Sequence, residues 1–149
     1  MNLPEVIEDI QYKVTKNIKD INRGGCIHFA YYLSETLKKY GFAHKIIAIN
    51  EIYYPDFEKM FNYNDSCRHI MVYIKGIGYI DGQATYSTIK EHSKAHRLEI
   101  ISQQFPKNFD LNKLREMSDM WNPLYDIRFN SKLEYYIKTS FKKIEYVKF

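Results

Sequence analysis

Cysteine is scarce in this sequence, which has only two, Cys26 and Cys67. The N-terminus, from Met1 to Glu5, has no basic stretch followed by an apolar run and so does not have the pattern of a secretory signal. Two cysteines without such a signal indicate free thiols in a reducing compartment and not a disulfide framework. We therefore expect a cytoplasmic protein.

Long uncharged stretches are also missing. Around Cys26, the stretch without Lys, Arg, Asp or Glu runs only from Gly24 to Ser34. A membrane-spanning helix needs about 20 apolar residues. The sequence therefore predicts no association with a membrane.

Charge of one sign is not concentrated anywhere. The chain has 22 Lys and Arg against 18 Asp and Glu, a net charge of +4, and its lysines are scattered. The densest region, from Lys132 to Lys148, is interrupted by Glu134 and Glu145. Proteins that bind nucleic acid usually gather their positive charge on one face. We do not expect a nucleic acid to be the partner.

What is present is the composition of a folded protein. The 149 residues are 45% hydrophobic and 27% charged, which is close to the globular average. The sequence has no repeat, low-complexity tract or linker. It therefore predicts a single domain, residues 1–149, that is large enough to bury a substantial core.

Hydrophobic periodicity predicts helices at both ends of the chain. Apolar residues recur at helical spacing from Leu3 to Ile21 and from Cys26 to Tyr40, where Gly41 suits a helix C-terminus. The segment from Ser131 to Ile144 has helical spacing too, although its β-propensity is high. Two further helices are predicted at Ser87–His96 and around 110–120.

Strand patterns lie between these helices. We predict strands at His44–Asn50 and Leu98–Ser102, and an irregular loop from Glu51 to Ser66 that can include one short helical turn at Asp56–Phe61. His69–Ile74 and Gly78–Asp81 flank Lys75-Gly76, which is a hairpin turn signal. The predicted fold class is α+β, with helices packed on a small antiparallel sheet.

The run Gly24-Gly25-Cys26 stands where the second helix begins. Helix N-terminal amides and the helix dipole favour an anion, so a cysteine there tends to be a thiolate. The glycines allow a substrate carbonyl to approach the backbone and leave N–H groups for an oxyanion. These features indicate a nucleophilic cysteine, which needs a base and a group that orients the base.

The predicted hairpin can supply both groups. His69 should lie opposite Asp81, Gly82 or Gln83, depending on the length of the turn, and opposed side chains are about 5 Å apart. A carboxylate at that distance would select one tautomer of the histidine and stabilise its charged form. Cys26, His69 and Asp81 are thus a candidate catalytic triad, with Gln83 as an alternative partner of His69.

These residues resemble the core of the transglutaminase-like and papain-like cysteine superfamily. The resemblance covers about Asn22 to Gly82 and lies in Gly-x-Cys-x-x-Phe-Ala, then His69, then Asp81-Gly82. The glycines before the cysteine are also similar to those of arylamine N-acetyltransferases. The layout resembles that of small uncharacterised bacterial and phage-encoded proteins, and a phage protein would work in the host cytoplasm.

The resemblance implies a papain-like fold in which Cys26 is the nucleophile, His69 the general base and acid, and Asp81 the residue that orients His69. The oxyanion would be bound by Asn22 or by backbone amides near Gly25. We expect a cysteine hydrolase, a peptidase or amidase that acts on a peptide, a protein or another amide or ester without a cofactor. The oligomeric state stays open.

Three alternatives remain at this stage. Cys26, His28, Cys67 and His69 form two Cys-x-His pairs with the ligand types of structural zinc, although i and i+2 diverge on a helix. The same scaffold could serve only to bind a partner, without catalysis. His92 and His96 have metal-ligand spacing on a predicted helix, but charged neighbours favour a solvent-exposed face for them.

Overall fold

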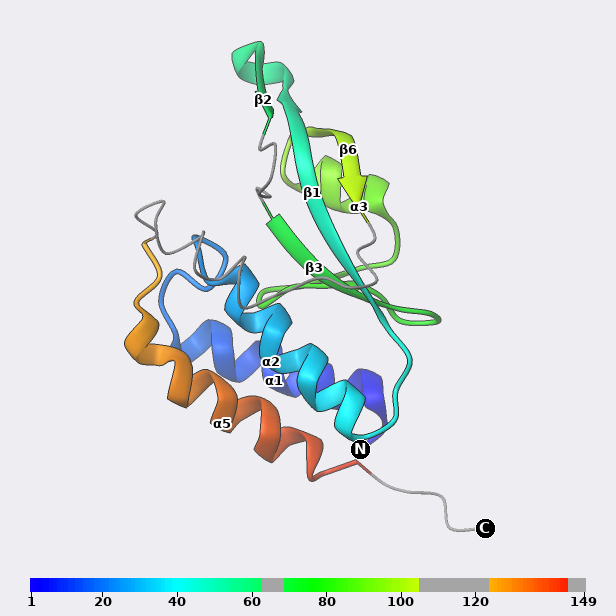
Figure 1. Cartoon of the computed structure of the whole chain (residues 1–149), viewed down its shortest axis with the longest axis vertical. Coiled ribbons are helices and arrows are strands. Elements are labelled where there is room, and N and C mark those ends of the chain that lie inside the picture. The colour runs from blue at the N-terminus through cyan, green and yellow to red at the C-terminus, as the bar shows by residue number, and fades with distance from the viewer. Residues whose placement is uncertain (63–68, 105–123, 145–149) are drawn as a thin grey trace.

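The structure is a computed structural model, and it describes residues 1–62, 69–104 and 124–144. Helices and antiparallel strands are combined in one α+β arrangement (Figure 1). The helices are α1 (Leu3–Asn17), α2 (Cys26–Lys39), α3 (Ile89–Ala95) and α5 (Asn130–Phe141). The strands are β1 (Lys45–Tyr54), β2 (Lys59–Asn62), β3 (His69–Ile74), β4 (Gly78–Ile80), β5 (Thr85–Tyr86) and β6 (Glu99–Gln104).

The strands form one sheet around the long strand β1. The order is β2-β1-β3-β4-β5, with β6 paired to β1 as well, and each of these pairs is antiparallel. The first half of β1 pairs with β3 and its second half with β2, so β1 extends beyond the helices (Figure 1). The predicted small antiparallel sheet is confirmed.

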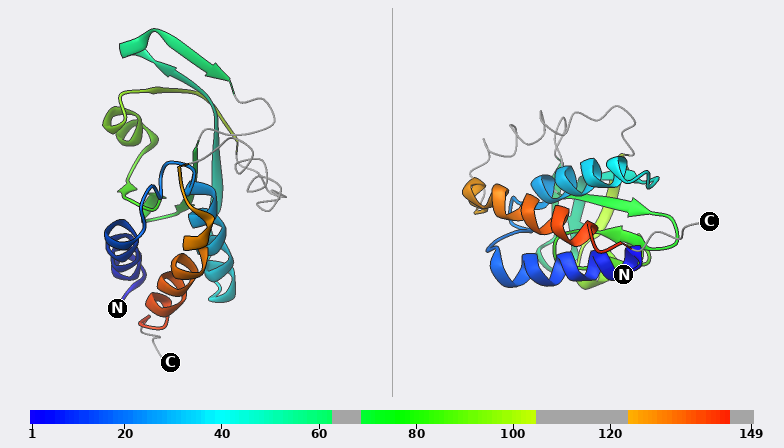
Figure 2. Two further views of the ribbon diagram at one scale, coloured as in Figure 1. Left: turned by 90° about the vertical axis from the view of Figure 1, so that its left-hand side faces the viewer. Right: turned by 90° about the horizontal axis from the view of Figure 1, so that it is seen from below.

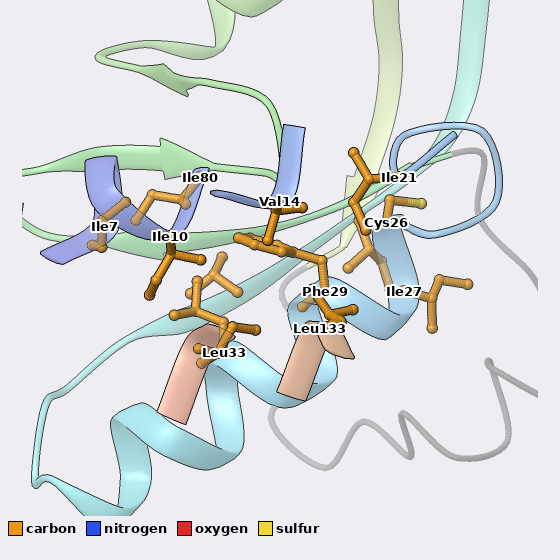
Figure 3. Close-up of a cluster of buried hydrophobic side chains, with 14 of the residues drawn as sticks. Ile7, Ile10, Val14, Ile21, Cys26, Ile27, Phe29, Leu33, Ile80 and Leu133 are labelled. Carbon is orange, nitrogen blue, oxygen red and sulfur yellow. The ribbon is translucent and has the colours of Figure 1, made fainter. Parts of the chain in front are cut away.

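Three helices cover one face of this sheet. α5 contacts both α1 and α2, and the three lie side by side beneath the strands (Figure 2). Their apolar stripes meet Ile46 and Ala48 of β1 and the even-numbered residues of β3 in a buried cluster (Figure 3). On the other side of the sheet Ile49, Ile52 and Met71 form a smaller cluster, and the β1–β6 pairing changes register between Ile49 and Ile52.

The first helix is shorter than its apolar stripe predicts. Asn2 and Glu5 form a capping box, and the helix ends at Asn17 instead of Ile21. The chain then turns through Asp20, whose φ of 60° is not helical. Ile21 is nevertheless only 2% exposed, because the turn folds back onto the same core.

The prediction of a loop from Glu51 to Ser66 was wrong over its described part. β1 continues to Tyr54, a short 3-10 helix occupies Pro55–Phe57, and β2 follows. Aromatic residues with high β-propensity are paired here on both edges of β1, by β2 and by β6. Pro55 and Glu58 make the turn between β1 and β2, and Glu58 has a φ of 50°. The polar residues of this turn are the reason why the sequence predicted a longer loop.

The remaining predicted elements agree with the structure where it describes them. The hairpin, the strand near residue 100 and the helix from about residue 131 are present as β3–β4, β6 and α5. The helix predicted around residues 110–120 lies outside the described residues. Within the described ranges, no helix combines the length and apolarity that crossing a membrane requires.

Candidate functional site

Cys26 begins α2, and the residue before it, Gly25, has no room for a side chain. A Cβ atom on Gly25 would lie 2.4 Å from the carbonyl oxygen of Ile21 and 2.7 Å from Cδ2 of Tyr125. No side chain caps this helix end, so the first-turn amides lack a side-chain acceptor. Figure 3 places Cys26 at one end of the buried cluster, in the first turn of α2.

His69 begins β3 and reaches Asp81, just beyond β4. The register pairs Val72 with Ile80 and Ile74 with Gly78, which would put Gln83 and not Asp81 directly opposite His69. Because β4 ends at Ile80, Asp81 approaches as a diagonal neighbour. His69 Nε2 lies 3.1 Å from Asp81 Oδ2.

The turn after β4 holds the Asp81 carboxylate from its other side. Asp81 Oδ1 accepts hydrogen bonds from the backbone N–H groups of Gln83 (2.8 Å) and Ala84 (2.9 Å). Gln11 of α1 donates its side-chain amide to the Asp81 carbonyl at 3.0 Å. The Gln83 side chain is exposed, so Gln83 supports Asp81 through its backbone, and Asp81 is the partner of His69.

His69 also interacts with the Cys26 thiol. Because Nε2 faces Asp81, Nδ1 is the nitrogen left for the thiol. Burial by itself would raise the pKa of Cys26, but hydrogen bonding to His69 and the charge of His69, with the backbone N–H of Ile70, outweigh burial and lower it. His69 thus stabilises the thiolate form of Cys26.

The partners of Cys26 show the matching shifts. Burial opposes the charged form of His69, yet its hydrogen bonds to Asp81 and Cys26 raise its pKa to about 10. Burial likewise opposes ionised Asp81, but His69 and the two backbone N–H groups lower its pKa to about 2. Near neutral pH His69 is therefore an imidazolium and Asp81 a carboxylate, and the lowered pKa of Cys26 favours its thiolate.

His92 belongs to this site, and the prediction that it faces solvent was wrong. It is only 2% exposed, and its ring stacks on His69 with centroids 5.6 Å apart and planes at 16°. Burial, then the charges of His69 and His96, lower the pKa of His92 to about 4, so it is neutral. Tyr86 packs edge-on against His92 and bonds His96 through its hydroxyl, at 3.0 Å.

A signal for this burial was available in the sequence. Thr88 accepts a hydrogen bond from the backbone N–H of Glu91, as a helix N-cap does. A helix that starts at Ile89 puts Ile89 and His92 three residues apart on one face. That face is the apolar one, and it packs toward the second cluster.

A pocket of about 100 Å³ opens beside His69. It is lined by Asn22, Ile49, Ile52, Tyr54, His69, His92, His96 and Leu98. Both side-chain amide atoms of Asn22 and Nδ1 of His92 are buried without a hydrogen-bond partner in the described part of the chain. Buried polar atoms normally have partners, so these atoms indicate where a ligand would bind.

The ligand atoms of His69, Asp81 and His92 lie within 4.8 Å of one another, close enough to be considered for a metal ion. His69 Nε2 already contacts Asp81 Oδ2 at 3.1 Å. A metal ion bound through these two atoms would have to replace this contact, so the geometry favours the His69–Asp81 pair over a metal centre.

The predicted zinc quartet is not brought together by the described residues. His28 turns away from Cys26 around α2, stacks on Tyr125 at 5.1 Å and contacts the Asn130 amide through Nδ1 at 3.3 Å. Cys67 lies outside the described residues.

Comparisons of the chain with protein-family models, with curated proteins and with solved structures gave no match.

Proposed function

We propose that the protein is a cysteine hydrolase that cleaves an amide or ester bond, with Cys26 as nucleophile, His69 as general base and acid, and Asp81 as the residue that orients His69. The observation that carries this proposal is the position of His69, whose Nε2 lies 3.1 Å from Asp81 Oδ2 and whose side chain lowers the pKa of Cys26. This is the constellation that an activated nucleophile requires.

In the acylation step, the Cys26 thiolate attacks the carbonyl carbon and forms a C–S bond, while the carbonyl electron pair moves to oxygen. The tetrahedral intermediate collapses when the bond to the leaving nitrogen or oxygen breaks. His69 gives its proton to that atom, which leaves as an amine or alcohol. The product on the enzyme is a thioester at Cys26.

In the deacylation step, neutral His69 takes a proton from water, and the hydroxide oxygen attacks the thioester carbon. The C–S bond breaks, and the carboxylic acid leaves. Asp81 keeps the imidazole oriented and stabilises its charge in both steps. Water is the proposed acceptor because no second acceptor site is evident among the described residues around His69.

The oxyanion of each intermediate needs hydrogen-bond donors. Asn22 lines the pocket beside His69, and its side-chain amide has no partner among the described residues. The backbone N–H of Cys26 opens an uncapped helix. We assign these two donors to the oxyanion, since donors held in place before the reaction stabilise the charge that develops.

We further propose that the arrangement is a papain-like or transglutaminase-like core, as the order Cys26, His69, Asp81 suggests. A cysteine that opens a helix and a histidine and aspartate on neighbouring strands of an antiparallel sheet support this assignment. A thiolate nucleophile also suits the reducing cytoplasm expected from the sequence.

The test is the pH dependence of alkylation of Cys26 by iodoacetamide, read separately from Cys67 by mass spectrometry. We expect an apparent Cys26 pKa well below the ordinary value of roughly 8.5. In His69→Ala it should rise above that value, because burial remains and the imidazolium is gone. Cys26→Ala should keep the fold and lose all activity toward a substrate.

The matched control is His44→Ala. His44 bonds Ser34 at 2.7 Å and the Phe42 carbonyl at 3.0 Å, near the other end of α2. This variant should leave the Cys26 profile unchanged. If His69→Ala fails to fold by circular dichroism, His69→Gln replaces it. A Cys26 that reacts only after unfolding would contradict the proposal and point to a binding protein on the same scaffold.

A further inference from the structure

We propose that the pocket beside His69 binds the side chain on the acyl side of the scissile bond, and that this side chain is uncharged, aliphatic and about the size of valine or leucine. The inference rests on the proposed function and names the substrate class for it. The substrate would be a peptide with such a residue immediately before the bond that Cys26 attacks.

The position of the pocket carries the first step. His69 is part of its wall and also acts directly on the Cys26 thiol, whose pKa it lowers. A carbonyl carbon attacked by Cys26 therefore lies next to this opening. Asn22, assigned above to the oxyanion, is in the same wall. A group attached to the carbonyl carbon can enter the pocket while the carbonyl oxygen stays near Asn22.

The volume limits the size of that group. A protein cavity of about 150 Å³ lined by apolar side chains can hold benzene. A pocket of about 100 Å³ is smaller, and therefore fits roughly three to five non-hydrogen atoms. An alanine side chain would leave most of it empty, and a phenylalanine side chain would not fit without rearrangement.

The lining sets the polarity of the group. Ile49, Ile52 and Leu98 give the pocket an apolar wall, and no Asp, Glu, Lys or Arg is among the described residues that line it. The charge of His69 is already balanced by Asp81 and Cys26. A charged side chain would lose water without gaining a partner, so the pocket favours a neutral aliphatic one.

His92 explains why the substrate should be a peptide and not a simple fatty acyl chain. Nδ1 of this neutral, buried imidazole has no partner among the described residues. An amide group beside the side chain, such as the backbone of a peptide, offers both a donor and an acceptor. Binding it would satisfy a polar atom that is otherwise buried and unpaired.

The experiment measures the second-order rate of Cys26 alkylation by N-acetyl-aminoacyl chloromethyl ketones, in which the thiolate attacks the methylene carbon and chloride leaves. The probes carry alanine, valine, leucine, phenylalanine, glutamate and lysine side chains. We expect the valine and leucine probes to react at least tenfold faster than the others. An analogue of the valine probe without the acetamido group should be slower.

Leu98→Phe fills the pocket from a half-buried position. It should remove the preference for valine and leucine when each probe rate is divided by the iodoacetamide rate of the same variant. The control is Ile127→Phe at an exposed site outside the pocket, which should keep the wild-type preference.

The two proposals fail in different ways. An activated Cys26 that reacts equally with all of these probes, or prefers a charged one, would overturn the pocket assignment and leave the hydrolase proposal standing. A Cys26 that is not activated toward iodoacetamide would overturn both.

Discussion

The two faces of the sheet are built differently. On the helix face, α1, α2 and α5 close a large cluster of apolar side chains over β1 and β3. On the other face, Ile49, Ile52 and Met71 form a small cluster, and α3 adds His92 beside a pocket. Figure 2 shows the three helices together and α3 apart from them.

This difference separates stability from chemistry. The helix face excludes water and provides most of the apolar burial that drives folding. The face with α3 keeps a cavity and polar atoms of Asn22 and His92 that have no partner among residues 1–62, 69–104 and 124–144, and these features reduce stability. Such costs are typical of functional sites, and the closed core on the opposite face makes them tolerable.

The largest expected effect on stability comes from removing a core side chain on the helix face. Leu33→Ala removes a fully buried side chain and should lower the free energy of unfolding by about 2–5 kcal/mol. Leu98→Ala, half-buried at the pocket, should cost about 1 kcal/mol or less. Urea denaturation of both variants compares the faces directly. Equal losses would show that the α3 face is as much a structural core as the helix face.

A smaller effect is expected on the pKa of His69. In Asp81→Asn, His69 loses the carboxylate that raises its pKa. The pKa of His69 should therefore fall from about 10 by about 1–3 pH units. NMR titration of the His69 ring measures this change. Turnover of a substrate should also fall, because the amide can select the wrong tautomer. Loss of the fold in this variant would instead assign Asp81 a structural role.

A third effect concerns the pH dependence of stability. The pKa of His92 is about 4 in the folded protein against an ordinary 6.5, so the folded state resists protonation and loses stability as pH falls from 6.5 toward 4. The groups around His92 are His69, His96, Asp81 and Tyr86. His92→Leu should flatten the stability profile in this window.

Two other pH ranges, in which Asp81 and His69 titrate, serve as internal controls for that measurement. The lowered pKa of Asp81 makes its contribution disappear as pH falls from 3.8 through about 2. The raised pKa of His69 makes its contribution disappear as pH rises from 6.5 through about 10. Both losses should persist in His92→Leu, measured by urea denaturation across pH. An unchanged slope between pH 6.5 and 4 would show that His92 is not held neutral.

Local pattern was enough to predict much of the scaffold. The stripe from Leu3, the helix that starts at Cys26 and the β3–β4 hairpin all follow from spacing within a short stretch of chain. Cys26 and His69 were predicted at the ends of these elements, and the structure places them there. The extension of β1 to Tyr54 was missed because it depends on pairing with β2 and β6.

The sequence by itself therefore determined the first two helices, the β3–β4 hairpin and the chemical groups at their ends, because helical and strand periodicity and turn residues act locally. Only the tertiary structure decided that Asp81, and not Gln83, pairs with His69, since the hairpin register and the end of β4 govern that contact. It also decided that His92 stacks on His69 and that a pocket opens there. These features join residues far apart in the chain, and no local pattern encodes such contacts.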